Sequence, residues 1–296
     1  MTDFIKEIAT KPLVCYGAVG TMLIQRGFDL TTCLGKWLID NPDHLKWLTH
    51  KYVDAGCRVI GSGGSQSGPW KLKTWGLENR IIEINSKVTS IIKEIIPEDC
   101  YITGTILPTG KLLKPMGDLD PNDLDKAYQQ ETEGYAKGGA DVIWVMTMMD
   151  IDEACIAVKA ARKSVDLPIM ASMAFDVTKK GIYTMMGVDP KTAAKRLVEA
   201  GADIVGHNCG NAAPDEITPI LEQMREVTNR PLVAKPNAGI PEVIDGETCW
   251  QSTPDQYAEN AVKWINAGAK IVGGCCGSTP EHAAQIRKAL DTQMIH

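Results

Sequence analysis

Leu-Val-Glu-Ala-Gly-Ala-Asp-Ile-Val-Gly, at residues 197–206, shows the pattern that decides the fold of this chain. An amphipathic stretch ends at a glycine and an apolar run begins within a few residues, as where a helix stops and a strand starts. The same pattern returns as Tyr-Val-Asp-Ala-Gly-Cys-Arg-Val-Ile-Gly at 52–61, Tyr-Ala-Lys-Gly-Gly-Ala-Asp-Val-Ile-Trp at 135–144 and Trp-Ile-Asn-Ala-Gly-Ala-Lys-Ile-Val-Gly at 264–273. These copies predict a repeated helix-to-strand unit.

Four further apolar runs lie between these copies, each short enough to be a buried strand. They are Pro-Leu-Val-Cys-Tyr at 12–16, Tyr-Ile-Thr-Gly-Thr at 101–105, Pro-Ile-Met-Ala-Ser at 168–172 and Pro-Leu-Val-Ala-Lys at 231–235. Apolar strands that alternate with amphipathic helices indicate a parallel sheet, and eight such units in this length predict an α/β fold, a (β/α)₈ TIM barrel. A doubly wound open sheet is the alternative, but no Gly-x-Gly-x-x-Gly opens a helix after the first strand. Residues 1–296 show no linker and are expected to form one domain.

Composition excludes several classes of protein. The chain has 296 residues, 44% of them hydrophobic, but no run of apolar residues long enough to cross a membrane. The N-terminus lacks the basic and apolar regions of a secretory signal. A net charge of −6 without a basic run argues against nucleic-acid binding. Nine cysteines without a framework pattern fit a reducing cytoplasm. A homo-oligomer is compatible with all of this.

Three cysteines have the strongest chemical pattern. Cys209 stands in Gly-His-Asn-Cys-Gly, and Cys275 and Cys276 stand in Gly-Gly-Cys-Cys-Gly, each directly after a predicted strand. Barrel active sites lie at the carboxyl ends of strands, so these thiols are expected to meet. Three thiolates suit zinc and leave its fourth position open, an arrangement typical of catalysis. The alternative for any one cysteine is a small buried apolar side chain. A bond between the adjacent cysteines would be strained.

The chain resembles the zinc-dependent homocysteine S-methyltransferases, which include the N-terminal module of cobalamin-dependent methionine synthase and betaine–homocysteine methyltransferase. The matching stretches are Gly-Ala-Val-Gly-Thr at 17–21, Leu-Pro-Thr-Gly-Lys-Leu-Leu at 107–113, Thr-Met-Met-Asp-Ile-Asp-Glu-Ala at 147–154, Ala-Phe-Asp at 174–176, Gly-His-Asn-Cys-Gly at 206–210, Lys-Pro-Asn-Ala-Gly-Ile-Pro at 235–241 and Gly-Gly-Cys-Cys-Gly at 273–277. The resemblance implies a (β/α)₈ barrel, zinc on Cys209, Cys275 and Cys276, and methyl transfer. In the family, zinc keeps the substrate sulfur as a thiolate.

The chain departs from that family where the family holds the amino-acid end of homocysteine. Tyr16 and Met146 stand where the family usually has acidic residues, and 61–68 reads Gly-Ser-Gly-Gly-Ser-Gln-Ser-Gly. A buried ammonium without its partner costs several kcal/mol, so these changes argue against an amino-acid substrate. We expect Tyr16, Met146, Gly63, Ser65 and Trp70 to bind a less polar substrate instead.

Other polar and aromatic residues have two interpretations each. His207 and Tyr16 are candidate catalytic proton donors to a leaving group, although His207 could equally be a histidine satisfied by backbone at the edge of the core. Trp144, Trp70 and Trp75 could line the pocket, but Trp144 facing the helices and the other two packing in loops is the simpler expectation. Asp150 and Asp176 are expected to be solvated or to cap helices.

These features predict a zinc-dependent methyltransferase of a corrinoid-linked system. It would move a methyl group between a small non-amino-acid substrate, such as a methoxylated aromatic or a methylated thiol, and a corrinoid carried by a separate protein. We expect a separate carrier because about twenty residues after Cys276 leave no room for a corrinoid module. Two alternatives stay open: a homocysteine S-methyltransferase that makes methionine, and a zinc-stabilised barrel that only binds a partner.

Overall fold

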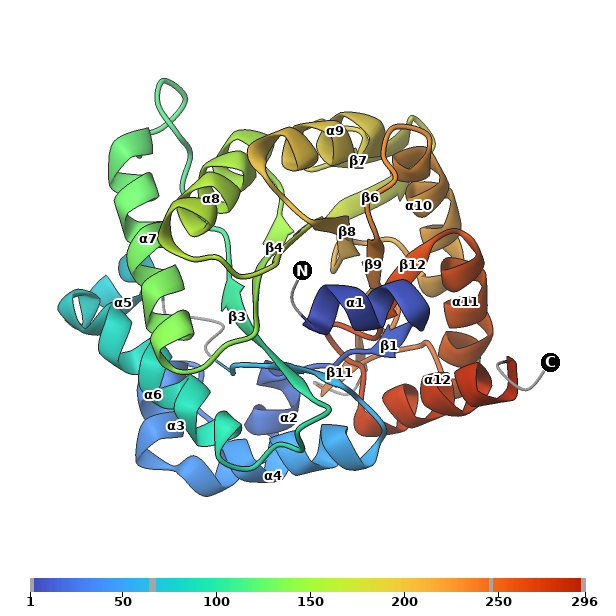
Figure 1. Ribbon diagram of the computed structural model, residues 1–296, viewed down its shortest axis with the longest axis horizontal. Helices are drawn as coiled ribbons and strands as arrows, with labels where there is room; N and C mark the ends of the chain where they lie inside the picture. The colour runs from blue at the N-terminus through green and yellow to red at the C-terminus, as the bar shows by residue number, and fades with distance from the viewer. Residues whose placement is uncertain (1–2, 64–67, 245–246, 294–296) are drawn as a thin grey trace.

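The computed structural model of the chain describes residues 3–63, 68–244 and 247–293. Eight parallel strands form a ring with helices around it (Figure 1). The strands are β1 (Leu13–Val14), β2 (Val59–Gly61), β3 (Tyr101–Ile106), β4 (Val142–Met148), β5 (Ile169–Met173), β8 (Ile204–Asn208), β9 (Leu232–Lys235) and β12 (Ala269–Val272). All eight predicted strands are present, which confirms the (β/α)₈ barrel, and the open-sheet alternative is wrong.

The ring closes where the first strand meets the second. The sheet runs β1-β12-β9-β8-β5-β4-β3-β2, and Cys15 bridges to Val59 in parallel beyond the end of β1. Two backbone hydrogen bonds support this closure, from Tyr16 N to Val59 O at 2.9 Å and from Arg58 N to Val14 O at 2.9 Å. A closed ring leaves no sheet edge unpaired, and it brings all the carboxyl ends of the strands to one rim.

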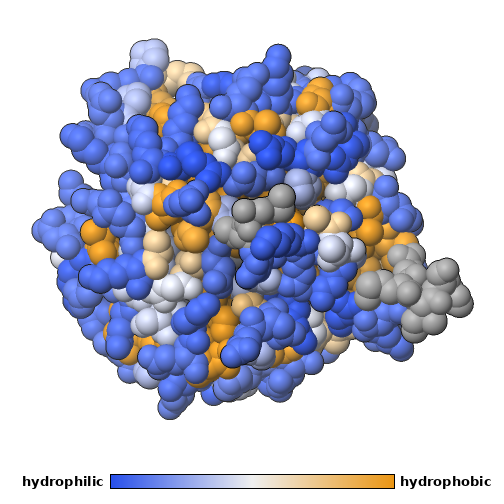
Figure 2. Space-filling view, in the orientation of Figure 1, coloured by the Kyte–Doolittle hydropathy of each residue, from blue (hydrophilic) through white to orange (hydrophobic). Residues whose placement is uncertain are grey.

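Helix α1 (Asp3–Thr10) covers the opposite, amino-terminal end of the barrel. It crosses the middle of the ring in Figure 1 and buries Phe4 and Ile8. The surface on this side is mainly hydrophilic, with small apolar areas between the hydrophilic side chains (Figure 2). None of the described helices is both long and apolar enough to cross a bilayer.

The outer helices begin and end as the repeated pattern predicts. Asp189 caps α9 by accepting from Thr192 N, and Gly201, at φ 113°, ends it three residues before β8. Larger helices are α4 (Pro42–Asp54), α6 (Ile81–Lys93), α7 (Pro121–Lys137), α8 (Ile151–Ser164), α9 (Pro190–Ala200), α10 (Ile217–Arg225), α11 (Pro254–Asn266) and α12 (Pro280–Gln293). Shorter ones are α2 (Gly20–Ile24), α3 (Leu34–Asp40), α5 (Pro69–Lys73) and two 3₁₀ turns at Glu78–Arg80 and Pro214–Glu216.

Two antiparallel hairpins extend the carboxyl-terminal rim, and the sequence patterns did not predict them. β6 (Phe175–Thr178) pairs with β7 (Gly181–Thr184) directly after β5, and β10 (Glu242–Ile244) pairs with β11 (Glu247–Cys249) after β9. Their strands are only three or four residues long. Such short strands contain too few alternating apolar and polar residues to be distinguished from loops.

Candidate active site

Cys209, Cys275 and Cys276 meet at the rim, as predicted. Cys209 follows β8 and the pair follows β12, and the three Sγ atoms all lie within 4.8 Å of one another. All three are free thiols. The sulfurs of a tetrahedral zinc site, with Zn–S bonds of about 2.3 Å, are roughly 3.8 Å apart. The donor set and its spacing therefore fit a soft divalent cation with one position left open.

Local backbone geometry turns the cysteines toward each other. Cys209 adopts a left-handed conformation, φ 60°, which is uncommon outside glycine, and Gly210 follows at φ 68°. A Cβ on Gly210 would lie 2.2 Å from the Phe175 carbonyl oxygen, so glycine is required there. Asn237 then joins the two cysteine turns: its Nδ2 donates to Gly210 O at 2.8 Å, and its Oδ1 accepts from Cys276 N at 3.1 Å.

Asn208 links the cysteine site to the neighbouring strands of the barrel. Its Oδ1 accepts from Thr147 N at 2.7 Å and from Ser172 Oγ at 2.6 Å. Its Nδ2 donates to Thr147 Oγ1 at 2.6 Å and lies 3.9 Å from Cys275 Sγ. Ser172 in turn accepts from Trp144 Nε1 at 2.9 Å. A fully satisfied buried network of this kind holds ligand side chains in one orientation.

Of the three thiols, Cys275 is the one that most readily carries a negative charge. Hydrogen bonds from Cys209 and Cys276, helped by the nearby Lys235 ammonium, hold the pKa of Cys275 well below its usual range. The hydrogen bond to Cys275 raises the pKa of Cys209 to about 11, and hydrogen bonds to Cys209 and then to Cys275 raise the pKa of Cys276. A cation bound by all three would deprotonate the remaining thiols.

Lys235, at the end of β9, is a site residue that the sequence analysis missed. Its side chain is 1% exposed, and its Nζ donates to Gly274 O at 2.6 Å and to Gly17 O at 3.5 Å. The same nitrogen lies 4.4 Å from the centroid of the Tyr16 ring. The available signal was its position: a lysine closes an otherwise apolar strand, Pro-Leu-Val-Ala-Lys, on the rim that carries active sites.

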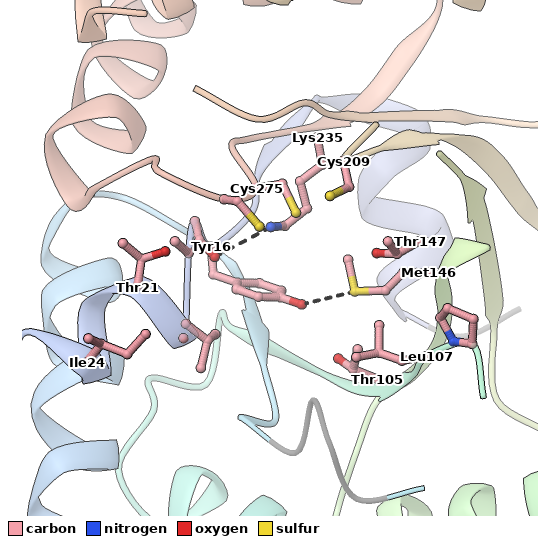
Figure 3. A pocket seen from close by; sticks show the side chains of 16 residues that line it. Tyr16, Thr21, Ile24, Thr105, Leu107, Met146, Thr147, Cys209, Lys235 and Cys275 are labelled. Atoms are coloured by element: carbon pink, nitrogen blue, oxygen red, sulfur yellow. Dashed lines mark hydrogen bonds between the residues drawn. The ribbon is translucent and has the colours of Figure 1, made fainter. Parts of the chain in front are cut away.

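A cavity of about 400 Å³ opens beside the cysteines (Figure 3). Its described lining is mostly apolar and contains no Asp or Glu: Tyr16, Gly17, Ala18, Val19, Gly20, Thr21, Ile24, Thr105, Leu107, Pro108, Met146, Thr147, Cys209, Lys235, Cys275 and Cys276. Tyr16 and Met146 both line it, and the Tyr16 hydroxyl lies 3.7 Å from Met146 Sδ. Burial raises the pKa of Tyr16, so its hydroxyl stays protonated at neutral pH.

The other predicted site residues that the structure describes do not line this cavity. His207 is fully buried beside the Phe175 ring, its Nδ1 accepts from Phe175 N at 3.4 Å, and burial lowers its pKa to about 4. Gly63 is buried against Leu45, and Trp70 is half-buried against the core. Neither these two nor His207 is among the described residues that line the cavity. Ser65 lies outside the described residues.

The remaining aromatic and acidic candidates have structural contacts. Trp144 lies inside the barrel, 6.1 Å from the Tyr16 ring and edge-on to it, so the expectation that it faces the helices is wrong. Trp75 packs in a loop and donates to Thr31 O at 3.0 Å. Asp150 caps α8, as expected of an aspartate there. Asp176 accepts from Asn211 N at 2.8 Å and so holds the loop after Cys209.

Comparison with known proteins gives relatives over nearly the whole chain. The chain is 26% identical to a methionine synthase of Mycobacterium tuberculosis and 24% identical to one of Mycobacterium leprae, in each case over 98% of this chain. It spans only about a quarter of the length of those proteins, 25% of each.

Solved structures show the same fold. The homocysteine methyltransferase MmuM from Escherichia coli, in its metallated form, superposes with a TM-score of 0.78 at 18% identity, covering 96% of this chain and 98% of that one. A methyltransferase from Methanosarcina mazei superposes with a TM-score of 0.61 at 11% identity, covering 96% and 95%. The sequence model of the homocysteine S-methyltransferase family matches residues 13–290. The chain therefore belongs to the homocysteine S-methyltransferase family.

Proposed function

We propose that this methyltransferase acts with zinc and transfers a methyl group from a small, uncharged, non-amino-acid substrate to a corrinoid carried by a separate protein. Methoxylated aromatics and methyl thioethers are the substrate classes that fit. The observation that carries the proposal is the cavity itself. It joins a three-cysteine site to a largely apolar wall, without an Asp or Glu among its described lining residues.

The proposed metal would be held by Cys209, Cys275 and Cys276. When bound, zinc would supply Lewis acidity that favours the anionic form of a substrate sulfur or oxygen. Asn208 and Asn237 support this role, because they hold the cysteines and their turns through side-chain contacts. Amides that contact the metal ligands or their backbone set the orientation of those ligands.

The substrate class follows from charge. An amino-acid substrate brings an ammonium that needs a carboxylate partner, since an unpaired buried charge costs several kcal/mol. The cavity offers Met146 and Tyr16 at the positions where the family resemblance leads us to expect acids, together with the buried Lys235 cation. An aromatic or thioether substrate would pack against Tyr16, Leu107 and Met146 with no unpaired charge.

In the proposed reaction, the bond between the methyl carbon and its oxygen or sulfur breaks, and the electron pair stays on the heteroatom. The methyl carbon bonds to Co(I) of the corrinoid partner, which becomes methyl-Co(III). The Tyr16 hydroxyl lines the cavity and could donate a hydrogen bond to the leaving atom. His207 has no part in this proposal because it does not line the cavity.

Exposed apolar side chains on the rim support a partner that closes over the mouth. They lie in the connections after β1, β3, β5 and β9, which all leave the barrel at the end where the cysteines lie: Ile24, Leu112, Met116, Met185, Met186, Ile240 and Val243. Apolar side chains exposed on one rim are typical of a surface that contacts another protein.

A homocysteine S-methyltransferase that makes methionine is the second candidate. The family match and the methionine synthase relatives favour it, and a three-thiolate zinc site suits a thiol substrate. In that case the ammonium of homocysteine would need a partner other than the described residues that line the cavity.

The test mixes the zinc-loaded chain with a Co(I) corrinoid protein and either a methoxylated aromatic or a methyl thioether, and follows the cobalt spectrum. We expect methyl-cobalt to form with one of these substrate classes and not without the chain. Methylation of homocysteine by the chain, with no methyl-cobalt from either class, would favour the second candidate. Loss of zinc with intact partner binding would favour a barrel that serves only as a binding subunit.

A further inference from the structure

We propose that Lys235 is the buried counter-ion of the cavity, and that it selects a methyl donor whose demethylated product is an anion, such as a thiolate or a phenolate. This inference rests on the proposed function and gives its substrate class a physical basis. It assigns a role to a residue that begins the Lys-Pro-Asn-Ala-Gly-Ile-Pro stretch but that the sequence analysis did not name as a site residue.

The position of Lys235 supports a role for its charge. The ammonium is buried at 1% exposure, at the cavity end where the cysteines lie (Figure 3). Its Nζ contacts the Gly274 and Gly17 carbonyl oxygens and the face of the Tyr16 ring. Among the described ion pairs, none involves Lys235 and a carboxylate. Although burial acts to lower the pKa of Lys235, the surrounding thiols and the Tyr16 hydroxyl, Cys275 foremost, raise it overall, so the ammonium keeps its charge.

Hydrogen bonding alone does not explain a lysine here. A neutral amide could donate to the Gly274 carbonyl just as well, without the desolvation that a buried ammonium requires. A buried charge is retained where an opposite charge must also be accommodated. Three thiolates and a divalent cation carry one net negative charge, which the Lys235 ammonium cancels.

This balance decides which ligands the cavity accepts. With Lys235, the loaded site is neutral overall, so one further negative charge can enter. Without Lys235, an incoming anion would be the second uncompensated negative charge in a buried site. As the bond from carbon to sulfur or oxygen breaks, the electron pair left on the heteroatom develops beside this cation. An interaction that strengthens as that charge develops lowers the barrier of the transfer.

The same cation disfavours a second positive charge in the cavity. An incoming ammonium would share the cavity with Lys235 and meet a like charge, whereas a neutral ether or thioether meets none. Lys235, Tyr16 and Met146 thus all disfavour an ammonium group in the cavity.

The experiment measures binding and needs neither a corrinoid nor turnover. Calorimetry on the zinc-loaded chain compares benzenethiolate, an anion, with thioanisole, its neutral methylated counterpart, at a pH where the thiol is ionised. The variants are K235Q, which keeps an N–H donor for Gly274 O, and K235M, which keeps only the apolar stem. K191M removes a lysine from an exposed ion pair with Glu226 and serves as the matched control.

Wild type and K191M should bind benzenethiolate more tightly than thioanisole. K235Q and K235M should keep zinc near one ion per chain, lose about tenfold or more in benzenethiolate affinity, and change thioanisole affinity by no more than about twofold. Equal losses for both ligands, or no loss for either, would overturn the counter-ion role. If K235Q and K235M do not fold, the wild-type chain still tests the proposal: equal affinity for benzenethiolate and thioanisole would overturn the counter-ion role as well.

The two proposals can fail separately. Suppose that K235Q loses benzenethiolate affinity and keeps thioanisole affinity, as expected, but no methyl-cobalt forms with any substrate. The counter-ion role then stands and the corrinoid reaction fails. If methyl-cobalt forms and K235Q binds both ligands like wild type, the reaction stands and the counter-ion role fails.

Discussion

The side-chain amide of Asn208 lies 3.9 Å from the sulfur of Cys275, although the two residues are 67 positions apart in the chain. The other contacts of Asn208 reach Thr147 and Ser172, so one amide connects the ends of β4, β5, β8 and β12. The metal-binding thiols are therefore held by a network that spans four strands, and not only by the turns in which they stand.

Replacing Asn208 by Ala should weaken the metal site without removing a ligand. We expect zinc affinity to fall about tenfold or more, as for other residues that orient metal ligands. The free energy of unfolding should fall by about 1–3 kcal/mol, because Thr147 N and Ser172 Oγ lose a buried partner. Chelator competition and denaturant titration measure the two effects. Asn260→Ala, in helix α11, is the control and should leave zinc affinity unchanged.

Each of Cys209, Cys275 and Cys276 should be required for zinc. Replacing any one by Ser should reduce bound zinc from near one ion per chain to a small fraction and abolish methyl transfer, while circular dichroism shows a folded barrel, because the ligands lie on rim turns. Cys155→Ser, on helix α8, should retain the metal. A Cys276→Ala variant with full zinc and full activity would rule out the assigned ligand set.

Homocysteine should bind weakly to the wild-type chain. Its binding free energy should be less favourable by a few kcal/mol than at a site that offers a carboxylate to its ammonium. The double variant with Met146→Glu and Tyr16→Asp should improve its affinity, and Met146→Gln should not, since it adds polarity without charge. Isothermal calorimetry with homocysteine measures this. Micromolar affinity in the wild type would contradict the prediction.

Glu131 should make the fold less stable as pH rises. Burial, reinforced by the nearby Glu153, raises the pKa of Glu131 to about 8, above its ordinary 4.5. The folded state then binds more protons than the unfolded state between these values, so stability is lost as pH rises through this range. The slope reaches at most about 1.4 kcal/mol per pH unit. Urea unfolding should show that the free energy of unfolding of Glu131→Gln depends less on pH than that of the wild type. Glu133→Gln, at an exposed position, should follow the wild type.

Several elements of the fold could be predicted from local patterns because they depend on neighbours in sequence. Glycine-terminated helices followed by apolar runs indicate strands wherever they occur, and a (β/α)₈ barrel brings every strand end to one rim. Cys209, Cys275 and Cys276 could therefore be placed together before any coordinates were known. The short hairpins β6–β7 and β10–β11 have no such periodic signal, and they escaped prediction.

The sequence by itself thus determined the barrel, the order of its helices and strands, and the three cysteines at its mouth. Only the tertiary structure decided which other side chains face those cysteines. Lys235 reaches the Gly17 carbonyl across 218 positions, Trp144 turns into the barrel, and His207 turns away from the cavity. The direction of a side chain in a closed barrel depends on strand twist and on packing against strands distant in sequence, which local patterns do not encode.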